Sequence, residues 1–149
     1  MPGSAPEPGA PALNIIRSPP KLSVDGQEIA CEKYNINGSN FFKLRDLAQL
    51  LNGTGSQFGV GYDAAAATVT VTTGKAYEST GTELKTGVNN SSTTQPSAQS
   101  ILINGTAHGE LTVYNIGGSN FFQLRELGNL LNFDVGYDAA SNTATVRSK

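Results

Sequence analysis

Few side chains in this sequence could carry catalytic or metal chemistry. The chain has one histidine, one cysteine and one methionine, which are His108, Cys31 and Met1. Copper and zinc sites need several such ligands around one metal ion, and one residue of each type is too few to form such a site. Nucleophilic catalysis would have to be built around a single histidine that has no place in the repeated motif described below. We therefore expect no metal, no cofactor and no enzymatic activity.

Four acidic residues could in principle form the carboxylate pair of a glycoside hydrolase: Asp46, Glu126, Asp63 and Asp138. The first two stand near the starts of predicted helices, where the helix dipole favours a negative charge. The other two follow predicted strands, where aspartate is a common turn residue. These structural roles account for all four acids without catalysis.

Arg45 and Arg125 stand in the first turn of the predicted helices. A cation opposes the helix dipole there, so each guanidinium group should have a compensating partner. We expect that partner to be backbone carbonyls, or a carboxylate such as Asp63 or Asp138. Binding of an external anion is the alternative.

Aromatic side chains are the only groups in the chain that could stack on sugar rings. Core packing is the simpler expectation for them. However, adjacent phenylalanines in an extended segment point to opposite faces, so one of each Phe-Phe pair could face solvent or the other copy of the repeat. The candidate ligand or partner surface is therefore Tyr34, Phe41, Phe42, Tyr114, Phe121 and Phe122.

Composition excludes several classes of partner. The 149 residues carry a net charge of −2, and the ten lysines and arginines are scattered, so we expect no nucleic acid partner. No apolar run approaches the roughly 20 residues that span a bilayer, so we expect no membrane insertion. Residues 1–20 lack the pattern of a signal peptide, so we expect any export signal to lie outside this sequence.

Proline placement divides the chain. Six of the seven prolines lie within residues 2–20, and the seventh is Pro96. Because proline lacks a backbone N–H and resists strand pairing, we predict a tail at residues 1–20 and a polar connector at residues 78–100 without structure of its own. The remaining segments, 21–77 and 101–149, are expected to form the folded body.

Those two segments are copies of one another. Residues 34–52 and 114–132 are identical at 14 of 19 positions, at a constant offset of 80. Residues 58–71 match residues 133–146 at an offset of 75, because the first copy carries five extra residues at 53–57. This is an internal repeat beyond chance.

Each copy is predicted to fold as ββ-α-ββ. Asp25-Gly26 and Asn104-Gly105, between short strand-like runs, predict hairpins. The leucines from 44 to 51 and from 124 to 131 recur at three- and four-residue spacing, which predicts a short helix. Ser39 or Asn40 is the expected helix cap. Asn52-Gly53 and Asn132 are expected to end the two helices through left-handed conformations.

A unit of about 50 residues buries too little apolar surface to be stable alone. We therefore predict an α+β fold in which the two ββ-α-ββ repeats pack as one pseudo-twofold domain with short antiparallel sheets, residues 21–149 forming a single compact body. Two independent domains are the alternative.

The motif YNI-x-GSNFF-x-LR-[DE]-L, followed by VGYDAA, occurs in both repeats. With it the sequence resembles the copper amine oxidase N-terminal-like domain, also called the stalk domain, which occurs in tandem in surface proteins of Gram-positive bacteria. The resemblance covers residues 21–77 and 101–149, and Tyr62 and Tyr137 stand where relatives often carry tryptophan. It implies a non-catalytic accessory module of an exported protein that is extracellular or associated with the cell wall. The copper in the name does not imply a metal site.

We expect such a module to act in protein interaction, spacing or dimerisation, through surface complementarity or exposed strand edges. The alternative is a carbohydrate-binding module for cell-wall or host glycans, which would use aromatic side chains on equivalent faces of both copies. An aromatic groove in both copies would favour glycan binding. A flat apolar patch or a bare sheet edge would favour protein contact.

Overall fold

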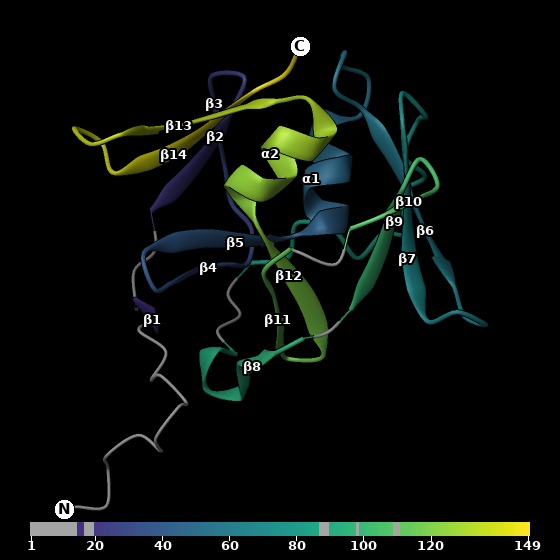
Figure 1. Cartoon of the computed structure of the whole chain (residues 1–149). Helices are drawn as coiled ribbons and strands as arrows, with labels where there is room; N and C mark the ends of the chain where they lie inside the picture. The colour runs from purple at the N-terminus through teal and green to yellow at the C-terminus, as the bar shows by residue number, and fades with distance from the viewer. Residues whose placement is uncertain (1–14, 17–19, 87–89, 98, 109–110) are drawn as a thin grey trace, which may run out of the picture.

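The computed structural model describes residues 15–16, 20–86, 90–97, 99–108 and 111–149, which form a mixed α+β fold. Its two helices lie between two outer four-stranded sheets, and a six-stranded central sheet crosses the middle of the molecule (Figure 1). Residues 1–14 and 17–19 of the predicted tail lie outside the described residues. Within the tail, β1 (Ile15–Ile16) pairs with the edge of the central sheet.

Two hairpins precede each helix, so the repeat is ββββ-α-ββ rather than the predicted ββ-α-ββ. The turns at Asp25-Gly26 (φ 49° and 87°) and Asn37-Gly38 (φ 52° and 87°) have positive φ at both central residues. This conformation matches the twist of the flanking strands and favours Asx-Gly pairs. The hairpin strands are β2 (Lys21–Val24), β3 (Gln27–Ile29), β4 (Lys33–Ile36) and β5 (Ser39–Lys43), then β9 (Ser100–Ile103), β10 (Thr106–Ala107), β11 (Val113–Ile116) and β12 (Ser119–Gln123).

Each outer sheet is built from both repeats. A final hairpin follows each helix, and its last strand pairs in parallel with the first hairpin of the other repeat: β14 with β2, and β7 with β9. The prediction of antiparallel sheets is therefore wrong at these two pairs, which have no local sequence signal. The final hairpins are β6 (Phe58–Asp63) with β7 (Thr68–Thr73), and β13 (Asp134–Asp138) with β14 (Thr143–Arg147).

The central sheet has the strand order β1-β4-β5-β12-β11-β8, where β8 is Gln95–Pro96. Its middle pair joins the two repeats, because β5 lies antiparallel to β12. In this pair Phe42 is opposite Phe122, and both side chains are buried. The Phe-Phe segments therefore form the seam between the repeats.

Both helices begin directly after a strand of the central sheet. They are α1 (Leu44–Leu51) and α2 (Leu124–Leu131). Neither start has a side-chain cap, and Ser39 and Asn40, the predicted caps, lie in β5. The expectation of a cap was wrong because the Phe-Phe segment extends the strand to the start of the helix.

The two helices end differently. Asn132 adopts the left-handed conformation (φ 65°, ψ 50°) and donates its backbone N–H to the Gly128 carbonyl, as predicted. Asn52 is extended instead (φ −63°), and the following Gly53 takes the positive φ of 84°. The five extra residues of the first copy begin at this glycine.

Buried apolar side chains form two clusters on opposite faces of the central sheet. The larger cluster contains Phe42 and Phe122 together with the leucines of both helices. The smaller cluster contains Phe41 and Phe121. Adjacent phenylalanines thus point to opposite faces, as predicted, but both faces are covered and all four rings are buried.

Candidate functional site

Five of the six aromatic residues proposed from sequence as a ligand surface are buried. Tyr34 packs its ring edge against Phe121 at 5.1 Å between centroids, and Phe41 packs against the half-buried Tyr114 at 5.2 Å. These side chains stabilise the fold. The large hydrophobic side chains that the structure exposes are instead Tyr62 and Tyr137, at 55% and 52%.

Tyr62 lines a cleft of about 470 Å³, here called the first cleft. One wall is the outer edge of β6, which carries Tyr62, and the other is the start of α1, which carries Arg45. Its third side is formed by Ser119 and Asn120 from the other repeat. The cleft therefore combines an exposed strand edge, one aromatic ring and several hydrogen-bonding side chains.

A second cleft, of about 460 Å³, repeats this arrangement around Tyr137 and Arg125. Ser39 and Asn40 take the places of Ser119 and Asn120, and β13 takes the place of β6. The two clefts are thus built from equivalent residues at offsets of 80 and 75. No single predicted motif contains them, because each needs side chains from both repeats.

The arginines of the two clefts have different partners. Arg45 donates to the Tyr77 hydroxyl at 3.5 Å, and Tyr77 in turn donates to the carboxylate of Glu83 in the connector. Burial and the Glu83 contact raise the pKa of Tyr77, so its hydroxyl stays protonated. Arg125 donates to the Val135 carbonyl at 3.3 Å. Within the described part of the chain, the predicted carbonyl partner is therefore found for Arg125, whereas Arg45 bonds to a tyrosine hydroxyl.

Asp63 and Asp138 hold turns and do not pair with the arginines within the described part of the chain. The Asp63 carboxylate accepts from the backbone N–H groups of Ala65 and Ala66 at 3.1 and 3.3 Å. Asp138 accepts from the N–H of Ala140 at 3.1 Å and from the hydroxyl of Ser141 at 2.9 Å. This is the turn chemistry that the sequence indicated.

The two clefts also differ in charge. Among the described residues that line the second cleft, Arg125 alone is charged. The first cleft contains both signs, including Lys43, Arg45 and Glu83. Tyr137 is held in place by a hydrogen bond from its hydroxyl to Asn142, so its exposed ring has a fixed position.

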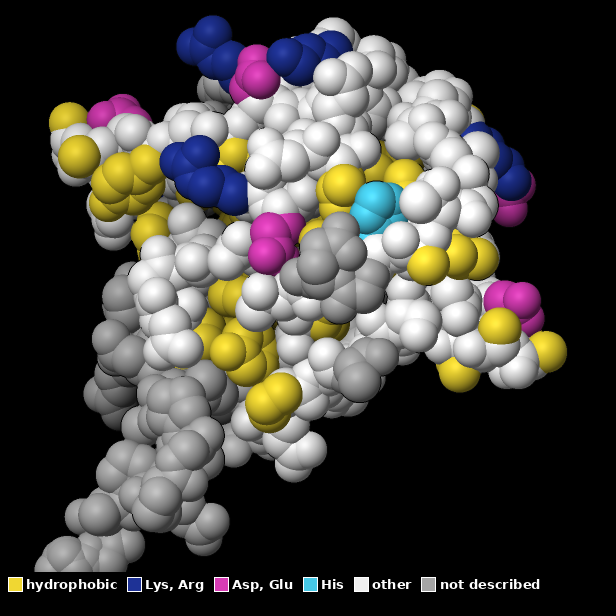
Figure 2. All heavy atoms as spheres, in the orientation of Figure 1, with side chains coloured by type: hydrophobic (Ala, Val, Ile, Leu, Met, Phe, Trp, Pro, Cys, Tyr) yellow, Lys and Arg dark blue, Asp and Glu magenta, His cyan; other side chains and the backbone are white. Residues whose placement is uncertain are grey.

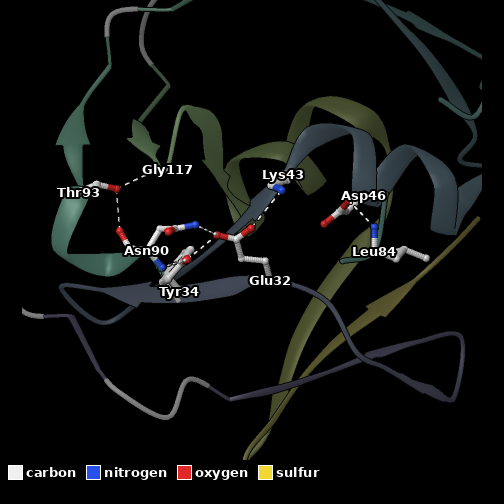
Figure 3. A network of polar contacts seen from close by, with 8 residues as sticks. All are labelled: Glu32, Tyr34, Lys43, Asp46, Leu84, Asn90, Thr93 and Gly117. Carbon is white, nitrogen blue, oxygen red and sulfur yellow. Dashed lines mark hydrogen bonds and ion pairs between the residues drawn. The ribbon is translucent and has the colours of Figure 1, made fainter. Parts of the chain in front are cut away.

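Beside the first cleft, a network of polar groups centred on the buried Glu32 and Tyr34 binds the connector to the body (Figure 3). The Glu32 carboxylate pairs with Lys43 Nζ at 3.1 Å and accepts from the Tyr34 hydroxyl at 2.5 Å. The same hydroxyl accepts the backbone N–H of Asn90 at 2.8 Å. Burial and the bond to Glu32 raise the pKa of Tyr34 to about 12, so this hydroxyl remains a donor.

Asp46 provides a second attachment. Its Oδ1 accepts the backbone N–H of Leu84 at 2.9 Å, while Oδ2 is buried without a partner among the described residues. Burial raises the pKa of Asp46. In the other repeat the equivalent Glu126 accepts the N–H of Thr112 at 2.7 Å. Asp46 is therefore a structural acid that holds the connector.

The described part of the connector has structure of its own, contrary to the prediction. It contains a 3-10 turn at Ser91–Thr93 and the strand β8. The Thr93 hydroxyl accepts the backbone N–H of Gly117 at 2.7 Å. A polar, aperiodic sequence gave no sign of this, because the connector is held by hydrogen bonds to distant residues.

The Glu32–Lys43 pair was missed in the sequence although a signal existed. At the equivalent positions the second repeat has Thr112 and Gln123, so both members of one charged pair appear only in the first copy. When an acidic and a basic residue are both replaced by uncharged residues in an otherwise similar repeat, the two charged residues are expected to contact each other.

The described surface shows no metal cluster, since none of its His, Cys, Asp and Glu side chains gather in groups of three or more. Charged side chains are dispersed over the face in Figure 2 and do not form one basic stripe there. Within the described residues, neither helix has the length and hydrophobicity needed to cross a membrane. Comparisons of the chain with protein-family models, with curated proteins and with solved structures found no match.

Proposed function

We propose that this chain is a non-catalytic accessory module of an exported or cell-surface bacterial protein, and that it binds a protein partner or a second copy of itself. The observation that carries the proposal is the pair of equivalent clefts, each bordered by the edge strand of an outer sheet, β6 or β13. An edge strand offers unpaired N–H and C=O groups to an incoming strand. The location outside the cell rests on the resemblance to stalk domains.

The two clefts support binding at two points. In the register of the β5–β12 pair, three pairs of residues lie opposite each other: Phe42 and Phe122, Phe41 and Gln123, and Lys43 and Phe121. Exchanging each residue for its counterpart 80 positions away leaves this register unchanged, so we infer a pseudo-twofold axis through the Phe42–Phe122 pair. Such an axis would present two similar clefts to partners, and two linked contacts bind far more tightly than one.

Photo-crosslinking tests the proposal. The photoreactive phenylalanine analogue benzoylphenylalanine at position 62 or 137 should give covalent adducts with protein, either with a second copy or with a partner on intact cells. The matched control is the same residue at exposed Glu28, on β3 at the opposite edge of the sheet from β13. Protein adducts no more abundant than those of the control would overturn the proposal.

The second candidate function is glycan binding, which the exposed rings favour. Tyr62 and Tyr137 each stand beside amide and guanidinium groups, a combination that can stack on and hydrogen-bond to a sugar ring. Binding to purified cell-wall polysaccharide that is lost in the double variant Tyr62→Ala, Tyr137→Ala would support it. The buried Phe41→Leu serves as the control, because Phe41 lines neither cleft.

A further inference from the structure

Lys43 and Asn90 meet at the same buried carboxylate. Glu32 contacts Lys43 Nζ through Oε1 at 3.1 Å and Asn90 Nδ2 through Oε2 at 3.5 Å (Figure 3). Its side chain is 4% exposed, whereas that of Lys43 is 21% exposed. An amine and a carboxamide from distant parts of the chain are thus held on the two oxygens of one acid.

An amine, a carboxamide and a carboxyl group are the reactants and the catalyst that an amide exchange needs. A lysine amine is a nucleophile once it loses its proton, and a carboxamide carbon that it attacks can release its nitrogen once that nitrogen receives a proton. A carboxyl group between them can perform both proton transfers. Fixed proximity lowers the barrier, because no encounter of separate molecules is needed.

We propose that Lys43 and Asn90 become joined by a side-chain amide bond, with Glu32 as the general acid and base. Glu32 takes a proton from the Lys43 ammonium group, and the neutral Nζ attacks Cγ of Asn90. The protonated Glu32 gives its proton to Nδ2, the amide atom that its Oε2 contacts, and then takes a proton from the attacking nitrogen. The carbonyl re-forms as the Cγ–Nδ2 bond breaks. The departing ammonia takes the last proton from Glu32 to become ammonium, and Glu32 returns to the carboxylate. No oxidant or reductant is required.

The surroundings hold the reactants in place. The Tyr34 hydroxyl donates to Glu32 at 2.5 Å and accepts the Asn90 backbone N–H at 2.8 Å, so it fixes the acid and the carboxamide residue together. The Lys43 ammonium lies 5.8 Å from the centre of the Phe121 ring, which covers it. A Cβ on Gly117 would come within 2.6 Å of Asn90 Nδ2, so a glycine is needed for the carboxamide to reach this position.

The second repeat provides an internal comparison. Thr112 and Gln123 replace Glu32 and Lys43, so these two positions carry neither an acid nor an amine in the second repeat. The amide bond is therefore specific to the first repeat. It would close a loop from residue 43 to residue 90 and attach the connector covalently to the central sheet.

Intact mass spectrometry of the purified full chain tests the proposal. We expect a mass below that of the sequence by one ammonia, unchanged by denaturant or reducing agent. Protease digestion should yield one branched peptide that joins Lys43 to Asn90. Glu32→Gln and Lys43→Gln should both restore the sequence mass, and Lys43→Gln places the residue of the second repeat at this position.

The variant Asn90→Asp distinguishes this reaction from other losses of ammonia. A carboxylic acid at position 90 would react with loss of water, so the variant and the natural chain should reach the same final mass. An unshifted natural chain would overturn the proposal. So would a shift that persists in Lys43→Gln, since that would identify a succinimide at an Asn-Gly pair such as Asn37-Gly38. Circular dichroism of each variant shows whether it has folded, and the Asn90→Asp result holds even if Lys43→Gln does not fold.

Discussion

Leu22, on the first strand of repeat 1, lies opposite Ala144, on the last strand of repeat 2. Both side chains are about 1% exposed or less. The two ends of the folded body therefore meet in one parallel strand pair, and neither outer sheet belongs to a single repeat. Because the two repeats share this strand pair, we expect them to unfold together.

Replacing Leu22 tests whether the repeats unfold together. Leu22→Ala removes a fully buried side chain and should lower the free energy of unfolding by about 3 kcal/mol, typical of large-to-small core changes. Urea unfolding followed by circular dichroism should remain a single transition at a lower midpoint. Ser23→Ala, on the same strand, should change the midpoint far less. Two separated transitions, with only one of them shifted, would show that the repeats fold independently.

Asp46→Asn should change how stability depends on pH. Burial raises the folded-state pKa of Asp46 above the ordinary value of 3.8, so the folded protein binds more protons than the unfolded chain above that pH. Stability from this group therefore falls as pH rises from 3.8 through the raised pKa. The asparagine keeps an acceptor for the Leu84 N–H and removes that fall.

Urea midpoints measured from pH 4 to pH 8 check this expectation. Above the raised pKa, Asp46→Asn should be at least as stable as the natural chain, and its profile should be flatter. Leu47→Ala, which removes a fully buried neighbour, should lower the whole profile without changing its shape. If the urea midpoints of Asp46→Asn and of the natural chain changed with pH in parallel, the raised pKa of Asp46 would be contradicted.

Glu83→Gln should loosen the connector without unfolding the domain. Burial alone would raise the pKa of Glu83, but hydrogen bonds from Tyr77 and Thr80 outweigh it and hold the pKa well below 4.5. The stabilisation is thus present above pH 4.5 and is lost as pH falls through the lowered pKa. Hydrogen exchange at neutral pH should become faster in residues 77–84 of the variant and stay unchanged in α1. The exposed Glu78→Gln is the control, and equal exchange in both variants would argue against the role of Glu83.

Asn132→Ala should destabilise the domain by about 1 kcal/mol, because alanine lacks the tolerance of asparagine for a left-handed conformation. Asn132→Gly should be more stable than Asn132→Ala, since glycine adopts the left-handed conformation without strain. Thermal melts of the two variants check the difference. If alanine and glycine gave the same midpoint, the backbone conformation at residue 132 would not be the cause.

Local signals in the sequence predicted local structure well. The Asx-Gly pairs are turns because few other residues accept positive φ at two successive positions, and the leucine spacing marks the two helices. The repeat also predicted that the two copies would have similar elements. The α+β class follows from these signals alone.

Partners distant in sequence could not be predicted in this way. Strand β2 has the same pattern whether it pairs with its own repeat or with β14, so the exchange between repeats has no local mark. The clefts could not be predicted for the same reason: Tyr137 shares a cleft with Ser39 and Asn40 only after the two repeats pack together. The burial of Phe41 and Phe121 also depends on this packing, because the smaller cluster draws side chains from both copies.

The parallel pairing of β2 with β14 determines how the domain would respond to mechanical load. Lys21 lies beside Thr143 and Val24 beside Val146, so the chain enters this pair at one end and leaves it at the other. A force that pulls the two flanks apart would slide the strands along each other, and it would strain all the hydrogen bonds between them at once. Bonds loaded together resist rupture better than bonds that open one after another, so this pair would act as a mechanical clamp.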